Sequence, residues 1–434
     1  MARKGAKKIN VVTLGCSKNL VDSEHIMAQL EAAGYRLEFD SNDTDAKIVI
    51  VNTCGFIGDA KEESIETILS FAQAKEEGMI DKLYVIGCLS ERYADELRNE
   101  IPEVDQYFGV RDITGVVREL CGEWRDDLAT ARVQTTPDHY AYLKISEGCN
   151  WHCAYCAIPL IRGRHISVPM ESLIEEATKL AESGVKELIV VAQDTTYYGI
   201  DLYGRRALAE LLEKLCRVEG IEWIRLHYAY PTDFPDDVIE VMAREEKICK
   251  YLDIPLQHVS DNQLKAMRRR IDKQGSIELI ERLRSRIPDI ALRTTMLVGF
   301  PGETEEDFEE LLEFVRQTKF ERLGAFAYSE EEGTPSAKME DNVPADVKES
   351  RVERLMELQG SLSLGNNQRR VGEEMKVIID SREGDFWIGR SQYDSPEVDQ
   401  ELLISSPKRL KIGEFYTVRI TEADEFDLYA ELVK

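Results

Sequence analysis

The chain has 434 residues, of which 43% are hydrophobic, and this excludes a wholly disordered protein and suggests about three domains. Its 82 acidic and 55 basic side chains give a formal net charge of −27, which disfavours nucleic-acid binding through a general basic surface and favours a basic partner. No apolar run is long enough to span a membrane, and the basic start leads into a strand pattern rather than a signal peptide, so we expect a cytoplasmic protein. In that reducing compartment, cysteines are more often metal ligands or buried thiols than disulfides.

The first part of the chain, residues 8–134, alternates short apolar runs with helical patterns. Residues 46–53 carry apolar side chains on both faces of the expected strand, which is typical of a central parallel strand. Gly34 and Gly78 follow the first two helical patterns, at the place where glycine commonly ends a helix. This rhythm predicts a doubly wound α/β domain. The expected strands are 9–14, 46–53 and 82–87, and the expected helices are 22–33, 59–77 and 91–99.

A cysteine follows each of these three expected strands: Cys16, Cys54 and Cys88. The carboxyl ends of parallel strands meet at one edge of a sheet, so thiols far apart in sequence can converge there. Each cysteine has a glycine beside it, which permits a tight turn and close approach to a bulky ligand. One such cysteine alone is more often a buried small hydrophobic residue. Three at matching places favour a site for a metal cluster.

A linker at 135–138 leads into a second series of strands and helices, expected to form a domain over residues 135–365. Its six strand–helix units predict an open or partial barrel of parallel strands, with the chemistry at the carboxyl ends of the strands. Gln193 and Asp194 follow the second strand, and with polar residues after the other strands they outline a pocket, although each alone fits an ordinary turn. The expected strands are 141–145, 187–192, 223–228, 251–256, 291–298 and 324–328.

Directly after the first of these strands come three cysteines, Cys149, Cys153 and Cys156, spaced C-x3-C-x2-C without a fourth close by. A cube of four irons held by three thiolates keeps one iron open for a non-protein ligand. The alternative is a zinc site with His152 as fourth ligand, but zinc sites more often pair two C-x2-C motifs. With the aromatic Tyr155 before the last cysteine, the stretch resembles the signature of the radical S-adenosylmethionine enzymes.

The last part, residues 366–434, changes to short strands at regular spacing, which predicts a small closed β-barrel. From Asn367 to Lys434 the chain carries ten basic and fifteen acidic side chains. Such a surface should repel a phosphate backbone and attract a protein rich in Lys and Arg. Residues 268–270 and 408–409 are short basic runs, which are more often solvated faces than binding patches. The expected strands are 375–379, 386–388, 401–404, 416–420 and 427–433.

The three parts together resemble the methylthiotransferases, a family that joins an N-terminal cluster domain, a radical S-adenosylmethionine barrel and a C-terminal TRAM barrel. The resemblance covers almost the whole chain and matches it cysteine by cysteine. Four stretches are similar to the members that modify an aspartate of a small-subunit ribosomal protein. The Gly-Gly-Glu stretch typical of radical enzymes is absent, and Gln193 with Asp194 takes its place. The four stretches are 14–24, 193–199, 255–261 and 298–304.

The resemblance implies a transferase with two 4Fe-4S clusters, one held by each set of three cysteines. It implies S-adenosylmethionine bound near Tyr155, Gln193 and Asp194, and a sulfur donor held at the N-terminal cluster. One S-adenosylmethionine methylates that sulfur, and a second yields a radical that removes a hydrogen from the target carbon before the methylthio group is transferred. The implied partners are the ribosomal protein and an electron donor such as flavodoxin or ferredoxin, and we expect a monomer.

Two other functions stay open on the sequence. A tRNA methylthiotransferase of the same family would modify an adenosine. A non-catalytic iron–sulfur or zinc protein would bind RNA without any reaction, and replacement of Cys149 would separate catalysis from binding.

Overall fold

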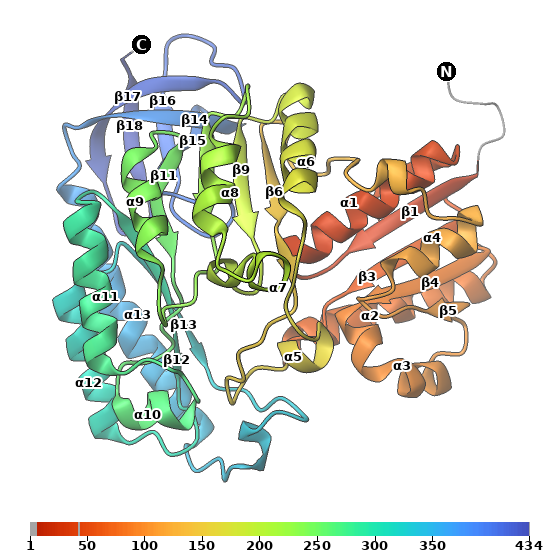
Figure 1. The fold of residues 1–434 in the computed structure, drawn as a ribbon, viewed down its shortest axis with the longest axis horizontal. Coiled ribbons are helices and arrows are strands. Elements are labelled where there is room, and N and C mark those ends of the chain that lie inside the picture. The colour runs from red at the N-terminus through yellow and green to blue at the C-terminus, as the bar shows by residue number, and fades with distance from the viewer. Residues whose placement is uncertain (1–6, 42–43, 434) are drawn as a thin grey trace.

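The computed structural model describes residues 7–41 and 44–433 (Figure 1). A flat α/β domain, drawn in red and orange, lies beside a curved sheet with helices on its outside, drawn from yellow to teal. A small barrel in blue covers one end of the curved sheet. Among the described residues, no helix is both long and apolar enough to cross a membrane.

The N-terminal domain is a parallel sheet with helices on both faces. Its elements are β1 (Lys8–Thr13), α1 (Ser17–Ala32), β2 (Arg36–Phe39), β3 (Ile48–Thr53), α2 (Gly58–Glu76), β4 (Lys82–Gly87), α3 (Cys88–Glu100), β5 (Gln106–Tyr107) and α4 (Ile113–Cys121). The strand order is β2-β1-β3-β4-β5, with all neighbours parallel. Every residue of β3 is buried, because α1 and α4 cover one face and α2 and α3 cover the other. The predicted doubly wound domain is confirmed.

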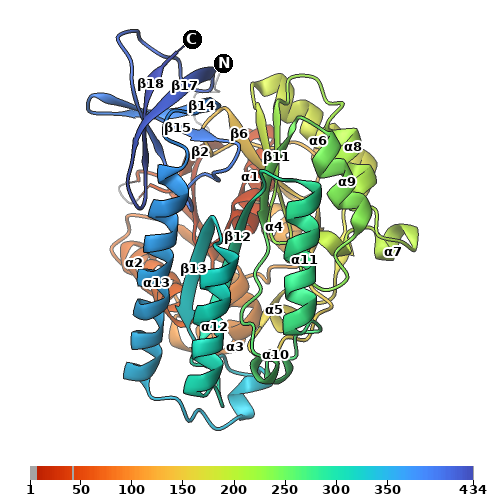
Figure 2. The ribbon, with the colours of Figure 1, turned by 90° about the vertical axis from the view of Figure 1, so that its left-hand side faces the viewer.

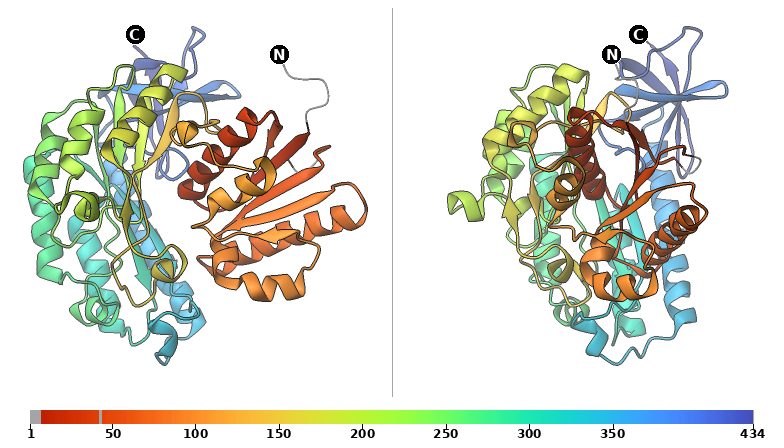
Figure 3. Two further views of the ribbon diagram at one scale, coloured as in Figure 1. Left: turned by 45° about the vertical axis from the view of Figure 1, so that its right-hand side comes forward. Right: turned by 90° about the vertical axis from the view of Figure 1, so that its right-hand side faces the viewer.

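Helix α1 begins earlier than the predicted start at residue 22. Gly15 turns the chain with a φ of 90°, and Cys16 precedes the helix in an extended conformation. The first turn is polar and yet buried, as Lys18 and Asn19 show. It faces the central domain rather than solvent, and the helix packs beside β6 of that domain (Tyr140–Lys144; Figure 3). Apolar periodicity, the main signal for a helix, cannot detect such a turn.

The central domain is an open barrel of six parallel strands. Its elements are β6 (Tyr140–Lys144), β7 (Ser146–Glu147), α5 (Ile158–Ile161), β8 (Ile166–Ser167), α6 (Met170–Ser183), β9 (Glu187–Val191), α7 (Ile200–Tyr203), α8 (Leu208–Leu215), β10 (Trp223–Leu226), α9 (Asp236–Arg244), β11 (Ile248–Asp253), α10 (Asp261–Ala266), α11 (Lys273–Arg286), β12 (Ala291–Val298), α12 (Glu305–Thr318), β13 (Arg322–Ala327) and α13 (Ala345–Gln368). The sheet order is β13-β12-β11-β10-β9-β6. Helices α6, α8, α9, α11 and α12 pack on its outer face around one apolar core, which confirms the predicted partial barrel.

The long helix α13 lies along β13 and α12 and leads into the C-terminal barrel (Figure 2). That barrel consists of β14 (Glu374–Glu383), β15 (Phe386–Ser391), β16 (Leu402–Ser405), β17 (Phe415–Ala423) and β18 (Leu428–Leu432), closed in the order β14-β15-β16-β18-β17. The predicted closed barrel is confirmed. The predicted domain limits at residues 134 and 365 stay predictions.

The segment 391–400, which we call the plug, enters the amino end of the central barrel. The Asp399 carboxylate lies 3.3 Å from Arg293 Nε, and Ser395 Oγ lies 2.8 Å from His227 Nε2. Arg293 lies near the amino end of β12, and Arg322, which pairs with Asp394 of the plug, is the first residue of β13, whereas His227 directly follows β10. The plug therefore fills the end of the barrel opposite to the edge where parallel strands usually carry their chemistry.

Candidate functional site

The structure brings the three N-terminal cysteines together at the carboxyl edge of their sheet. Cys16, Cys54 and Cys88 follow β1, β3 and β4, which are neighbours in the sheet. Burial raises the pKa of the Cys88 thiol to about 11; Arg162 opposes the rise, while Cys16 and Cys54 add to it. The three thiols are therefore close enough to shift one another's pKa values electrostatically.

The glycines beside these cysteines are required by close packing. A side chain at Gly15 would place its Cβ 2.7 Å from the Cβ and 2.9 Å from the Sγ of Cys54. At Gly87, where φ is 104°, a Cβ would lie 2.5 Å from the backbone oxygen of Thr53. Both positions exclude any larger residue, as the sequence interpretation of these glycines requires.

The second set of thiols lies on the loop that follows β6 and β7. The Cys149 N–H donates to Gly163 O at 3.0 Å, and the Ala154 N–H donates to Met267 O at 2.9 Å, so the loop is held from two sides. Burial, together with the nearby Asp194 and Cys153, raises the pKa of the Cys149 thiol to about 12. The pKa of Cys156 is also raised, first by burial and then by Cys153.

The donor set of this loop fits a cluster with one open position. Three thiols and no fourth protein ligand match an iron–sulfur cube in which one iron stays free. In the described part of the chain, no group of three or more His, Cys, Asp or Glu is arranged for a single metal ion. His152, the fourth ligand of the zinc alternative, is exposed on the loop. The assignment of all six cysteines as ligands stays a prediction.

An aromatic and cationic wall, which the sequence interpretation missed, surrounds Cys153. The ring of Tyr230 stacks on Trp151 with centroids 4.2 Å apart, and the Tyr230 hydroxyl lies 3.6 Å from Cys153 Sγ. Arg269 Nη1 donates to Cys153 Sγ at 3.6 Å and to the Tyr155 hydroxyl at 3.5 Å. The expectation that the run 268–270 is a solvated face is wrong for Arg269, which is buried.

The residues predicted to bind S-adenosylmethionine lie beside the cysteine loop. Tyr155 meets the edge of Phe300 with centroids 6.5 Å apart. Asp194 Oδ2 accepts a hydrogen bond from Trp151 Nε1 at 2.7 Å, so this carboxylate orients the loop. Gln193 Nε2 donates to Glu147 Oε1 at 2.8 Å, whereas its buried Oε1 has no partner among the described residues. Binding of the cofactor by these residues stays a prediction.

Arg162 connects the two sets of thiols. Its Nη1 donates to both carboxylate oxygens of Glu147 at 2.8 Å, just before the Cys149 loop. Its Nη2 donates to Cys88 Sγ at 3.3 Å. The guanidinium is buried, and no motif or spacing in the sequence distinguishes this arginine from others. The two sites thus share one cation across the boundary between the N-terminal and central domains.

Three known protein families match parts of this chain. Residues 143–315 match the Radical SAM superfamily, residues 8–109 match Uncharacterized protein family UPF0004, and residues 371–433 match the TRAM domain.

Solved structures with a similar fold include the radical S-adenosylmethionine methyltransferase TsrM from Kitasatospora setae, with cobalamin and a 4Fe-4S cluster bound. The TM-score is 0.56 at 13% identity, covering 76% of this chain and 74% of that one. The cobalamin-dependent radical enzyme OxsB has a TM-score of 0.51 at 13% identity, covering 81% of this chain and 56% of that one. At this identity the likeness concerns the fold alone.

Curated relatives match from end to end. Ribosomal protein uS12 methylthiotransferase RimO of Bacteroides thetaiotaomicron is 55% identical, with 98% of both chains covered. The protein of the same name from Phocaeicola vulgatus is 56% identical, covering 98% of this chain and 99% of the relative. The chain therefore belongs to the RimO family of ribosomal protein uS12 methylthiotransferases.

Proposed function

We propose that this protein transfers a methylthio group to the β-carbon of an aspartate in a small-subunit ribosomal protein, uS12 by the names of its relatives. The observation that carries the proposal is the meeting of two three-thiol sites across one domain boundary, joined by Arg162. A reaction that removes a hydrogen at one site and delivers sulfur from the other needs both sites within reach of one carbon.

When bound, S-adenosylmethionine and two 4Fe-4S clusters would supply a radical that removes hydrogen from an unactivated carbon, and the sulfur and methyl group that replace it. One cluster and its sulfur donor belong to the N-terminal thiols, and the other cluster to the Cys149 loop. Gln193 Oε1, buried without a partner among the described residues, is available to accept a hydrogen bond from the methionine ammonium. Trp151, fixed by Asp194 and stacked on Tyr230, forms one side of this site.

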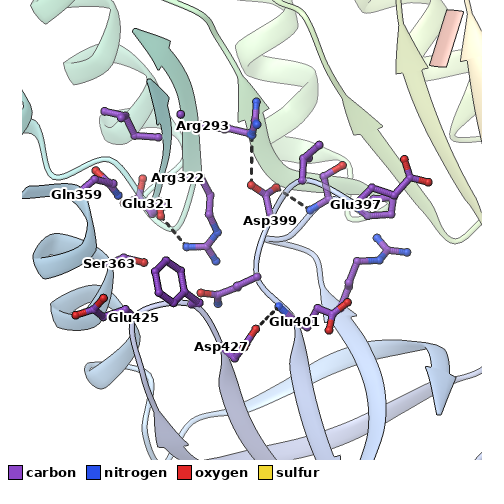
Figure 4. A pocket seen from close by; sticks show the side chains of 18 of the residues that line it. Arg293, Glu321, Arg322, Gln359, Ser363, Glu397, Asp399, Glu401, Glu425 and Asp427 are labelled. Carbon is purple, nitrogen blue, oxygen red and sulfur yellow. Dashed lines mark hydrogen bonds and ion pairs between the residues drawn. The ribbon is translucent and has the colours of Figure 1, made fainter. Parts of the chain in front are cut away.

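The charge of the molecule supports a basic protein rather than tRNA as substrate. A cavity of about 1060 Å³ lies between β13, α13 and the C-terminal barrel (Figure 4). Its carboxylates outnumber its arginines, so its field attracts Lys and Arg side chains and repels phosphates. The acidic residues that line it include Glu321, Glu397, Asp399, Glu401, Glu425 and Asp427. We also propose a cytoplasmic monomer, with flavodoxin or ferredoxin as electron donor.

The decisive experiment is mass spectrometry of ribosomal proteins and tRNA from a strain that lacks this gene. We expect the methylthio group to be missing from one ribosomal-protein aspartate and tRNA to be unchanged. Loss of a tRNA methylthio group with intact ribosomal protein would favour the adenosine alternative.

The two clusters are tested separately by reconstitution without oxygen. The native chain should hold about eight irons, and Cys149→Ala and Cys54→Ala should each lose about half of them. Only Cys149→Ala should abolish cleavage of S-adenosylmethionine, since the radical site lies in the central domain. Cys216→Ala, at the cysteine that directly follows α8, is the matched control. Native cleavage by Cys149→Ala would refute the radical assignment.

A further inference from the structure

Lys18 is a buried cation that lies beside Cys16 and Tyr228. Its side chain is 7% exposed, and its Nζ lies 3.4 Å from the centroid of the Tyr228 ring. Among the described residues, no carboxylate forms an ion pair with it. A buried ammonium group is costly unless an anion compensates it, so a residue of this kind usually has a ligand.

The acidic side chains nearby are already paired with other cations. Asp22, one turn further along α1, pairs with Lys144. Glu147 pairs with Arg162 at 2.8 Å and with Lys144 at 2.9 Å. Asp253, whose Oδ2 accepts from the Tyr228 N–H, pairs with Arg293 at 3.3 Å. Among the described residues, the acidic groups that face Lys18 are therefore the Cys16 thiol and the Tyr228 hydroxyl, and no carboxylate is left to pair with it.

Lys18 also lies where the two thiol sites face each other. It is two residues from Cys16, and the ring that it contacts belongs to the same loop as Tyr230, which touches Cys153. This loop follows β10 at the carboxyl end of the barrel. The target carbon must reach both sites, and in an aspartate the carboxylate is bonded directly to that carbon.

We propose that Lys18 binds the side-chain carboxylate of the target aspartate and selects it over neutral side chains and nucleobases. This inference rests on the proposed function and adds the residue that determines its substrate. A substrate without the carboxylate would leave the ammonium group buried and unpaired, which a site built for a charged partner rejects strongly. Tyr228 holds the lysine in place by its ring face.

The test compares isolated ribosomal protein uS12 with a version whose target aspartate is replaced by asparagine. The reconstituted native chain should bind and modify the aspartate form at least about 100-fold better, as expected for a buried charged pair. Lys18→Met keeps the length and the apolar contact with Tyr228 but removes the charge. It should keep the native iron content and reduce the preference in binding to less than about tenfold.

The control is Lys179→Met on the surface of α6, where the lysine pairs with Glu175, and it should keep the full preference. If Lys18→Met keeps the preference but loses about half of its iron, Lys18 serves the N-terminal cluster and the inference is wrong. If Lys18→Met does not fold, equal binding of both uS12 forms by the native chain would overturn the inference. If the native chain modifies neither form, the proposed function itself fails.

Discussion

At the residue scale, Arg162 holds the two thiol sites in register. Its guanidinium makes charged hydrogen bonds to Glu147 in the central domain and reaches Cys88 in the N-terminal domain. Because both ends of this connection are fixed by folding, Arg162 helps to set the relative position of the two cysteine sets, together with the ion pair between Lys144 and Asp22. A lysine could not replace Arg162, since only a planar fork bonds a carboxylate and a thiol at the same time.

Arg162→Met should destabilise the fold and reduce iron loading. The change removes one of the two cations that pair with the Glu147 carboxylate, the other being Lys144, at a cost of about 3 kcal/mol. We expect a lower midpoint of thermal unfolding and fewer irons per chain, measured by calorimetry and iron analysis. Arg164→Met, at an exposed neighbour, is the control. Native iron content and stability in Arg162→Met would show that the contact does not matter.

His258 should make the protein sensitive to acid. Burial lowers the pKa of its imidazole to about 4, so the unfolded chain takes up a proton at higher pH than the folded one. Its contribution to stability is complete above about pH 6.5 and is lost as the pH falls towards about 4. His258→Asn, whose oxygen can accept the 3.0 Å hydrogen bond from the Ser260 N–H, removes this titration.

Between about pH 7 and pH 5, this variant should lose about 2 kcal/mol less unfolding free energy than the native chain. Chemical unfolding at both pH values measures the difference. His152→Asn, at an exposed histidine, should behave like the native chain. An unchanged pH dependence in His258→Asn would contradict the assignment.

At the element scale, strands and helices with periodic apolar residues can be predicted from the sequence, whereas polar segments cannot. The central strands β3, β4 and β12 and the whole C-terminal barrel follow from apolar runs and regular spacing. The short edge strands β2 and β5 carry too few apolar residues to be recognised. The Cys149 loop is predicted from the spacing of its cysteines, and the N-terminal set from the places of its cysteines after three strands. No sequence pattern identifies the three buried cations Arg162, Arg269 and Lys18, because their surroundings are known only from the fold.

Gly15→Ala should disrupt the N-terminal site more than a backbone effect explains. The new Cβ would lie 2.7 Å from the Cβ of Cys54, in addition to the strain of a positive φ. We expect a loss of about 3 kcal/mol in unfolding free energy and of the N-terminal irons. Gly34→Ala is a close control, because its φ is 92° and nothing lies within 4 Å of the new Cβ. Equal effects of the two changes would mean that only the backbone matters.

At the scale of the whole molecule, buried charges join the central barrel to the C-terminal barrel. Arg225 Nε lies 2.7 Å from Glu187, and Arg390 reaches the same carboxylate at 2.8 Å from the C-terminal barrel. Arg322 pairs with Asp394 of the plug. Such ion pairs fix the position of the C-terminal barrel on the central barrel, because each buried charge requires an oppositely charged partner.

Asp394→Asn should loosen the C-terminal barrel from the central one. The change leaves Arg322 buried without its main anion, at a cost of about 3 kcal/mol. In calorimetry we expect the single unfolding transition to broaden or to divide, with the C-terminal barrel melting first. Glu431→Gln, at an exposed position of β18, should leave the transition unchanged. An unaltered transition in Asp394→Asn would show that the plug is not needed for coupling.

The plug also bears on how this architecture can be recombined. A chimera that takes its C-terminal barrel from another protein would leave Arg225, Arg293 and Arg322 facing a foreign loop inside the central barrel. A chimera in which only the C-terminal barrel is exchanged would therefore misfold. A chimera that keeps segment 391–400 together with the three arginines of the central barrel that contact it would fold. The C-terminal barrel and the arginines that receive its plug therefore have to be exchanged together.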